Sequence, residues 1–304
     1  MASSSQNSTA RAILYAFLAN GGIAIVKSWA AWLTGSGSML AEAIHSYADT
    51  ANQVLLFVGL KQSNKPPDDE HPLGYGMLSY FWSFVVAMLL FSVGGLFSIY
   101  EGIHKFRHPE PLSGAWVAIL VLAVAIVLET FSLIGCLREI RRVRGERPFR
   151  QWLKHTRGSE LVVVLGEDIA ALLGLGIALL FISLAIVSGN PVFDAIGSAC
   201  IGVVLIIISI LLTLRVQSLL VGRSADPMIR DSINRIINDS ENIEELFNTI
   251  TMQMGPYTLL AAKVRVKPGT DIDTAARDIN ALEARLKDEI PKLKWCFVEP
   301  DITD

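Results

Sequence analysis

Charge is scarce in this chain of 304 residues, of which only 18% are charged and 52% are hydrophobic. A mean hydropathy of +0.45 is too high for an ordinary soluble domain. This composition is typical of a polytopic membrane protein. The net charge of −3 gives no support to nucleic acid as a partner.

Several motifs are also missing. The three cysteines form no CxxC pair, so we expect buried thiols and no disulfide framework. No GxxxxGK[ST] segment is present, which points to ion gradients as the energy source. The pattern HExxH is absent, which argues against an intramembrane zinc protease. We therefore do not expect this protein to be an enzyme. The start, "MASSSQNSTARA", lacks the cationic segment of a signal peptide. Residues 1–11 are predicted to be a flexible tail.

Long apolar runs are what the chain has instead. About 20 mainly apolar residues cross the hydrocarbon core of a bilayer as a helix. Six segments of this kind predict an α-helical membrane domain over residues 12–220. They lie at about 12–34, 39–61, 78–102, 115–137, 160–187 and 194–216.

The connecting segments predict an orientation. The segment between the fourth and fifth spans, "LREIRRVRGERPFRQWLKHTRGSE", is rich in arginine, whereas "VSGNP" between the last two spans has no basic residue. Positive loops face the cytoplasm, so both termini are expected there. The basic segment is also suited to binding anionic lipid. The absence of targeting signals suggests a bacterial inner membrane.

After residue 220 the apolar runs stop. Asp226 and Pro227 are typical of a helix start, and two alternating segments around "GPY" predict a hairpin. A second amphipathic helix and a last strand follow. Residues 221–304 are thus predicted to be a cytoplasmic αββαβ domain, a small ferredoxin-like α+β sandwich. Its small size favours dimerisation.

This domain has no histidine, which excludes a zinc sensor built from imidazoles. Cys296, Glu299 and Asp301 lie close in sequence and offer a weak metal site. The simpler interpretation is a core cysteine beside surface acids.

Ionisable residues within the predicted spans need a reason, since each costs at least about 2.5–3.5 kcal/mol at the centre of a bilayer. His45 and Asp49 are four residues apart and share one helical face. Together with Asp168 of the fifth span they offer one nitrogen and two oxygen ligands, which suit Zn²⁺, Co²⁺ or Mn²⁺. The alternative is a neutral histidine bonded to an acid that joins two helices.

Three further charged residues receive auxiliary roles. Lys27 and Glu42 flank the short "TGSGS" connection, and we expect them to neutralise each other rather than Glu42 to bind metal. Glu129 suits either an ion path or proton transfer, or a structural hydrogen bond. Because metal displaces protons from such ligands, a site open alternately to each side would exchange cation for proton.

These residues carry a resemblance to a known family. "HSYAD", "EDIAALLGLGIAL", "PVFDAIGSACIG" and "PDDEHPLGYG" resemble segments of the cation diffusion facilitators, and "AEAIHSYADTANQ" with "LGEDIAALLG" is similar to their zinc transporter nine-type branch. The resemblance covers about residues 12–304. It implies six spans, a tetrahedral site from spans two and five, a homodimer, and efflux of a divalent cation in exchange for protons.

Two departures from the family pattern affect the predicted sites. Val164 stands where the fourth ligand is usual. The fourth ligand is then missing, or comes from Glu167, Glu42 or water. Glu167 is the tentative choice, although it lies about 100° around the helix from Asp168. In the loop after span two, Asp69, Glu70 and His71 form a weak possible metal site, because Tyr75 replaces a second histidine.

The sequence therefore predicts a zinc transporter without a prosthetic group, with Co²⁺, Mn²⁺ or Fe²⁺ as other possible cargoes. The competing hypothesis is a non-transporting subunit that binds a related membrane partner, motivated by the incomplete ligand set.

Overall fold

The computed structural model describes residue 17, residues 20–109 and residues 114–303. The predicted tail, residues 1–11, lies outside the described residues. The chain forms two compact units. The helical unit comprises the described parts of Met1–Lys61, Phe81–Glu146 and Ser159–Val216, and the C-terminal unit comprises Gln62–Tyr80, Arg147–Gly158 and Gln217–Asp304.

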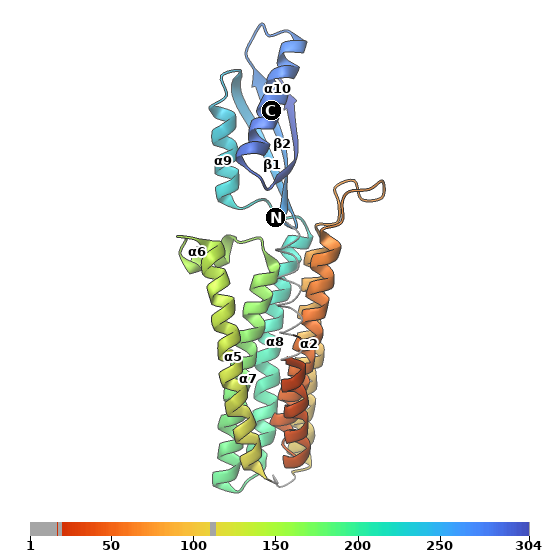
Figure 1. The fold of residues 1–304 in the computed structure, drawn as a ribbon, viewed down its shortest axis with the longest axis vertical. Helices are drawn as coiled ribbons and strands as arrows, with labels where there is room; N and C mark the ends of the chain where they lie inside the picture. Colours follow the sequence, from red (N-terminus) through yellow and green to blue (C-terminus); the bar gives the residue numbers. More distant parts are fainter. Residues whose placement is uncertain (1–16, 18–19, 110–113, 304) are drawn as a thin grey trace. The chain divides into compact units, whose positions relative to one another are not determined.

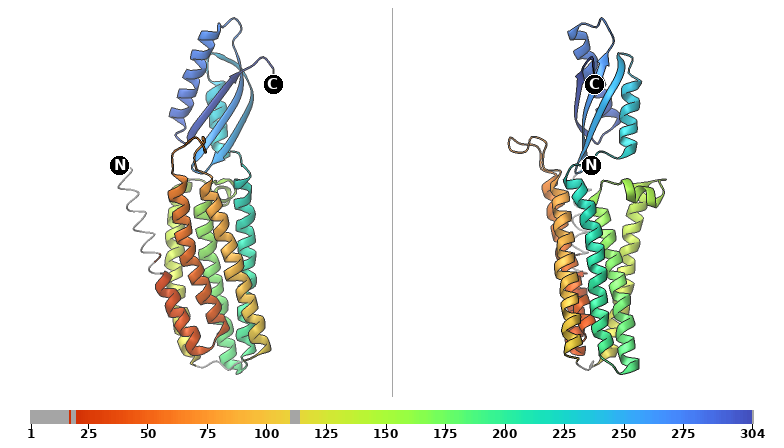
Figure 2. Two further views of the ribbon diagram at one scale, coloured as in Figure 1. Left: turned by 90° about the vertical axis from the view of Figure 1, so that its right-hand side faces the viewer. Right: turned by 180° about the vertical axis from the view of Figure 1, so that it is seen from behind.

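The helical unit is a bundle of long helices that lie side by side (Figures 1 and 2). A helix over residues 20–34 leads into α2. The other helices that cross this unit are α3 and α4, joined through η1, and then α5, α7 and α8. Their bounds are α2 Gly37–Ser63, α3 Leu78–Leu89, η1 Leu90–Leu96, α4 Phe97–Arg107, α5 Ala115–Arg144, α7 Ser159–Ser188 and α8 Val192–Leu220.

Four stretches among the described residues are long and apolar enough to cross a membrane. These four agree with predicted spans three to six, while the count of six stays a prediction. They are Leu78–Arg107, Trp116–Arg144, Ser159–Ser188 and Val192–Leu220. Helix α2 has 27 residues, which is also long enough to span the hydrocarbon core, but polar side chains interrupt its apolar surface.

The stretch Leu78–Arg107, predicted span three, is not the single regular helix that its apolar pattern had suggested. Residues Leu90–Leu96 form a π-helix, η1, between α3 and α4. The segment contains Gly94 and Gly95, both buried. Short π-helical segments within α-helices are frequent at functional sites, and apolar periodicity does not reveal them.

The C-terminal unit contains a three-stranded sheet of order β1-β2-β3, formed by β1 Ile243–Met254, β2 Tyr257–Val266 and β3 Leu293–Pro300. The first pair is antiparallel and the second is parallel. Helices α9 Pro227–Asn238 and α10 Ile272–Glu289 cover one face of the sheet (Figure 1). The predicted αββαβ order is thus confirmed.

The core of this domain lies between the sheet and its two helices. One cluster of buried side chains joins Ile233 and Ile237 of α9, Leu260 of β2, Leu286 of α10 and Cys296 of β3. Burial raises the pKa of the Cys296 thiol to about 12, so this cysteine is a core residue and not a ready metal ligand.

Helix α9 starts as the sequence predicted. The Asp226 side chain accepts a hydrogen bond from the backbone N–H of Met228, and Pro227 is the first helical residue. The Asp226 carboxylate also accepts a hydrogen bond of 2.7 Å from Arg147 Nη1, which forms an ion pair with it. Helix N-termini favour such acidic caps because the first amides lack partners within the helix.

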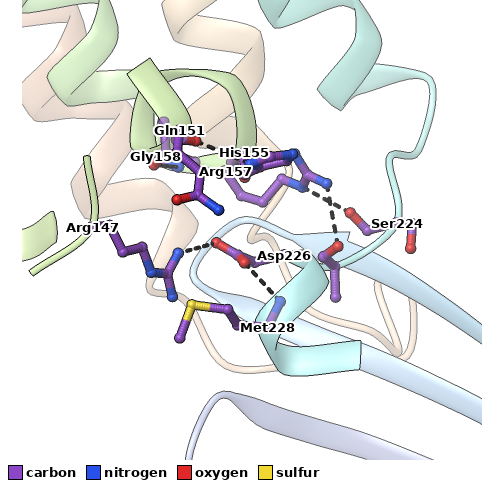
Figure 3. Close-up of polar contacts among 10 residues, drawn as sticks. Arg147, Gln151, His155, Arg157, Gly158, Ser224, Asp226 and Met228 are labelled. Carbon is purple, nitrogen blue, oxygen red and sulfur yellow. Dashed lines mark hydrogen bonds and ion pairs between the residues drawn. The ribbon is translucent and has the colours of Figure 1, made fainter. Parts of the chain in front are cut away.

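The basic segment contains a short helix that the sequence did not predict, α6 Phe149–His155. Arg157, just after this helix, donates hydrogen bonds to the carbonyl oxygens of Ser224 and Ala225 at 2.8 and 3.2 Å (Figure 3). Together with the Arg147–Asp226 ion pair, these bonds fix α6 beside the start of α9 within the C-terminal unit.

Candidate metal site

His45 and Asp49 lie on one face of α2, as their spacing predicted. Both residues are buried, with exposed fractions of 0% and 8%. His45 Nε2 lies 3.4 Å from Asp49 Oδ2, but neither ring nitrogen of His45 has a hydrogen-bond partner, nor does Asp49 Oδ1. Buried polar atoms without partners are rare and need an explanation, such as an ion that binds there.

Glu167 and Asp168 lie on α7, and both are buried. They face different neighbours, as two adjacent helical positions must. Glu167 Oε1 accepts a hydrogen bond of 2.6 Å from the side-chain amide of Asn52 on α2. Asp168 Oδ1 accepts one of 3.1 Å from the hydroxyl of Ser132 on α5, whereas Asp168 Oδ2 has no partner.

Asn52 and Ser132 had no role in the sequence-based site. Asn52 lies three residues after Asp49, and Ser132 three residues after Glu129, so both follow an acidic residue on the same helical face. That spacing was the signal that could have found them. Asn52 of α2 donates a hydrogen bond to Glu167, and Ser132 of α5 donates one to Asp168.

The sequence-predicted ligands do not close into a single cluster. Among the described residues, no group of three His, Cys, Asp or Glu side chains is arranged to hold a metal ion. The predicted ligands lie in two pairs, His45 and Asp49 on α2 and Glu167 and Asp168 on α7. Val164, at the usual position of a fourth ligand, is half-buried and brings no ligand atom. The assignment of ligands therefore stays a prediction.

The π-helix lies beside the histidine. A Cβ atom at Gly94 would be 3.9 Å from His45 Nδ1, so the backbone of η1 approaches one side of the imidazole. A larger residue at this position would place a side chain against the ring.

The Lys27–Glu42 pair is confirmed. Lys27 Nζ lies 3.0 Å from Glu42 Oε2, and both side chains are completely buried. Lys27 also donates to Ser46 Oγ at 2.8 Å. The attraction between two buried opposite charges offsets the cost of their desolvation only when the charged atoms are this close. This explains why Glu42 faces Lys27.

Glu129 of α5 is buried, with an exposed fraction of 8%. It lines a cavity of about 730 Å³ together with Ser132 and Gln53. The rest of this lining is mainly apolar and comes from α5 and the helix at residues 20–34.

The predicted loop site is organised around a different residue. Asp68 accepts hydrogen bonds from the His71 backbone N–H and the Tyr75 hydroxyl, both at 2.7 Å. The Tyr75 bond, with that of His71, holds the pKa of the Asp68 carboxyl below its usual value. The His71 ring lies against the Tyr75 ring with centroids 4.2 Å apart and planes tilted by 32°, while Asp69 and Glu70 are exposed.

A bundle of long apolar helices with buried carboxylates and an imidazole defines an integral membrane protein that crosses the bilayer several times. A family model, the cation efflux transmembrane domain, matches residues 13–221. The chain belongs to this family, the cation diffusion facilitators.

Curated relatives agree with the predicted branch. The proton-coupled zinc antiporter SLC30A9, mitochondrial, of Xenopus laevis is 34% identical over 80% of this chain and 43% of its own length. Zinc transporter ZitB of Escherichia coli is 28% identical over 76% of this chain and 64% of its length. Magnetosome protein MamB of Magnetospirillum gryphiswaldense is 25% identical over 95% of this chain and 93% of its own length. The chain thus spans less than half the length of the SLC30A9 relative.

One solved structure, of the MamM C-terminal domain, is 12% identical over 24% of this chain and 94% of its own, with a TM-score of 0.24.

Proposed function

We propose that this protein transports a divalent cation, most simply zinc, across a membrane in exchange for protons. His45 and Asp49 of α2, with Asp168 and Glu167 of α7, bind the cargo. The observation that carries the proposal is a set of buried polar atoms without hydrogen-bond partners on two neighbouring helices: both nitrogens of His45, Asp49 Oδ1 and Asp168 Oδ2. A cation would bind one imidazole nitrogen and the two carboxylate oxygens, and in its absence protons would bind to the same groups.

The hydrogen bonds of the α7 carboxylates fit an exchange cycle. Asn52 and Ser132 hold Glu167 and Asp168 when no cargo bridges the two helices. Zinc binding would draw Asp168 toward the α2 pair, and Glu167 would join by giving up its bond to Asn52. Nitrogen and oxygen ligands of this kind suit zinc, at about 2.0–2.2 Å.

The names of two relatives support the cargo, since one is called a zinc antiporter and the other a zinc transporter. We also propose a homodimer, with both termini on the side of the basic segment. For the compartment we propose a bacterial inner membrane; the SLC30A9 relative is named as mitochondrial.

Flux in liposomes tests the function. Purified protein should carry Zn²⁺ into vesicles with a zinc-sensitive dye, driven by a proton gradient, and Asp49→Ala and Asp168→Ala should abolish that flux. Asp271→Asn in the C-terminal domain is the control. Undiminished flux in either membrane variant would refute the site. No flux by the wild type, with capture of a related subunit, would favour the non-transporting hypothesis. Flux of Co²⁺, Mn²⁺ and Fe²⁺, measured in the same way and compared with that of Zn²⁺, identifies the cargo.

A further inference from the structure

The N-terminus of α2 is bound by a side chain from another helix. Asp194, in the first turn of α8, accepts hydrogen bonds from the backbone N–H groups of Gly37 and Ser38 at 2.6 and 3.1 Å. It also accepts one of 2.7 Å from the Ser36 hydroxyl. Ser38 Oγ donates a fourth bond, of 2.9 Å, to the Asp194 carbonyl oxygen.

These bonds complete the cap of α2. Ser36 Oγ accepts from the Met39 N–H at 3.1 Å, which is the usual N-cap bond. The Gly37 and Ser38 amides would lack partners within the helix, and Asp194 supplies both. The carboxylate lies at the N-termini of two helices, α2 and α8, where the helix dipoles favour negative charge.

The surroundings leave little room for movement at this point. Asp194 is buried, with an exposed fraction of 2%, and Ser36 and Ser38 are equally enclosed. A Cβ atom at Gly37 would lie 2.9 Å from Ser198 Oγ and 3.1 Å from Lys105 Cγ. Lys105 of α4 donates to the Gly35 carbonyl oxygen at 2.5 Å. The turn before α2 is therefore held by α4 and α8 together.

The position of this cap determines the position of the His45–Asp49 pair on α2. His45 lies seven residues beyond Ser38 on the same continuous helix, which is two turns and about 10 Å. Asp49 follows one turn later. A tilt or slip of the α2 terminus would therefore move both side chains relative to α7, where Glu167 and Asp168 lie.

We propose that Asp194 is a positioning residue for cation binding. It touches neither cargo nor ligands, but it holds α2 on α8 so that the His45–Asp49 pair faces α7. The inference rests on the proposed function. A loosened α2 spends a smaller fraction of its time in the binding geometry. The apparent affinity for zinc falls in proportion to that fraction. The Michaelis constant should rise, while the maximal rate changes much less.

A graded series of variants tests this idea by zinc flux in liposomes. Asp194→Asn removes the charge and places an amide against two N–H donors, and it should raise the KM for zinc about fivefold, the size expected for a lost cap. Ser36→Ala and Ser38→Ala each remove one contact with Asp194 and should raise KM by less. Asp271→Asn, which changes an N-cap in the C-terminal domain, is the matched control with unchanged KM.

The outcomes separate the two proposals. A wild type without flux counts against the proposed function. A wild type with flux, and folded Asp194→Asn protein with the same KM, refutes the positioning role alone. If Asp194→Asn yields too little folded protein, the two serine variants decide: a lower amount of protein at wild-type KM means a purely structural cap, which also refutes the inference.

Discussion

The side-chain amide of Asn52 donates a hydrogen bond of 2.6 Å to Glu167 Oε1 and thereby joins α2 to α7. Asn52 lies three residues after Asp49, so this bond is next to the proposed ligand pair on α2. It gives Glu167 a position in the structure that is separate from metal binding, and the two roles of this carboxylate can be tested apart.

Glu167→Gln keeps an oxygen that accepts from Asn52 but removes the charge that a metal ligand needs. We expect zinc affinity to fall roughly tenfold or more, the range for weakened metal sites, with folding unchanged. Isothermal titration of zinc into purified protein measures this. Asn52→Ala is the matched variant, which removes the bond and leaves the carboxylate. Wild-type affinity in Glu167→Gln would show that Glu167 only joins the two helices.

A second prediction concerns the buried pair of Lys27 and Glu42. Removal of one partner leaves a buried charge alone, which typically costs about 3–5 kcal/mol, whereas loss of both is often tolerated. Lys27→Met should therefore lower the thermal unfolding temperature in detergent markedly, and Lys27→Met/Glu42→Gln should regain much of that loss. Ser46→Ala, which removes the second acceptor of Lys27, should have a small effect. A double variant less stable than Lys27→Met would contradict the pairing argument.

Some features of the fold can be predicted from the sequence for physical reasons. The Lys27–Glu42 pair could be predicted because a short turn forces two helices together and an unpaired charge in lipid is expensive. The αββαβ domain was visible in its apolar periodicity. Helix η1 and Asp194 were not predictable in this way. A π-helix leaves the apolar pattern almost unchanged, and the Asp194 contacts bridge positions 156 to 158 residues apart.

The third prediction concerns the arginines of the basic segment. Arg157 donates to the carbonyl oxygens of Ser224 and Ala225, whereas Arg147 forms one part-exposed ion pair with Asp226. Exposed ion pairs contribute little, so Arg157→Ala should speed backbone hydrogen exchange in α6 more than Arg147→Ala does. Mass spectrometry of peptides from the intact protein measures this. Arg150→Ala, at an exposed position of α6, is the control; equal effects of all three would refute the ranking.

The last prediction is a pH dependence in the C-terminal domain. The Asp271 side chain caps α10, accepting from the Thr274 hydroxyl at 2.7 Å and from the Thr274 and Asp273 amides at 3.0 and 3.1 Å. These bonds, with the Thr274 hydroxyl the largest contribution, hold the pKa of Asp271 below its usual value.

A carboxyl group with a lowered pKa in the folded state stabilises the fold above its unfolded pKa, about 3.9, and that contribution is lost as the pH falls through the lower, folded value. The first turn of α10 should therefore be well protected from hydrogen exchange at pH 6 and lose protection in acid below about pH 4, after correction for intrinsic exchange rates. Asp271→Asn has no such group, so its first turn should already exchange faster at pH 6 and change less with acid. An identical pH profile in the two proteins would show that the cap does not depend on this charge.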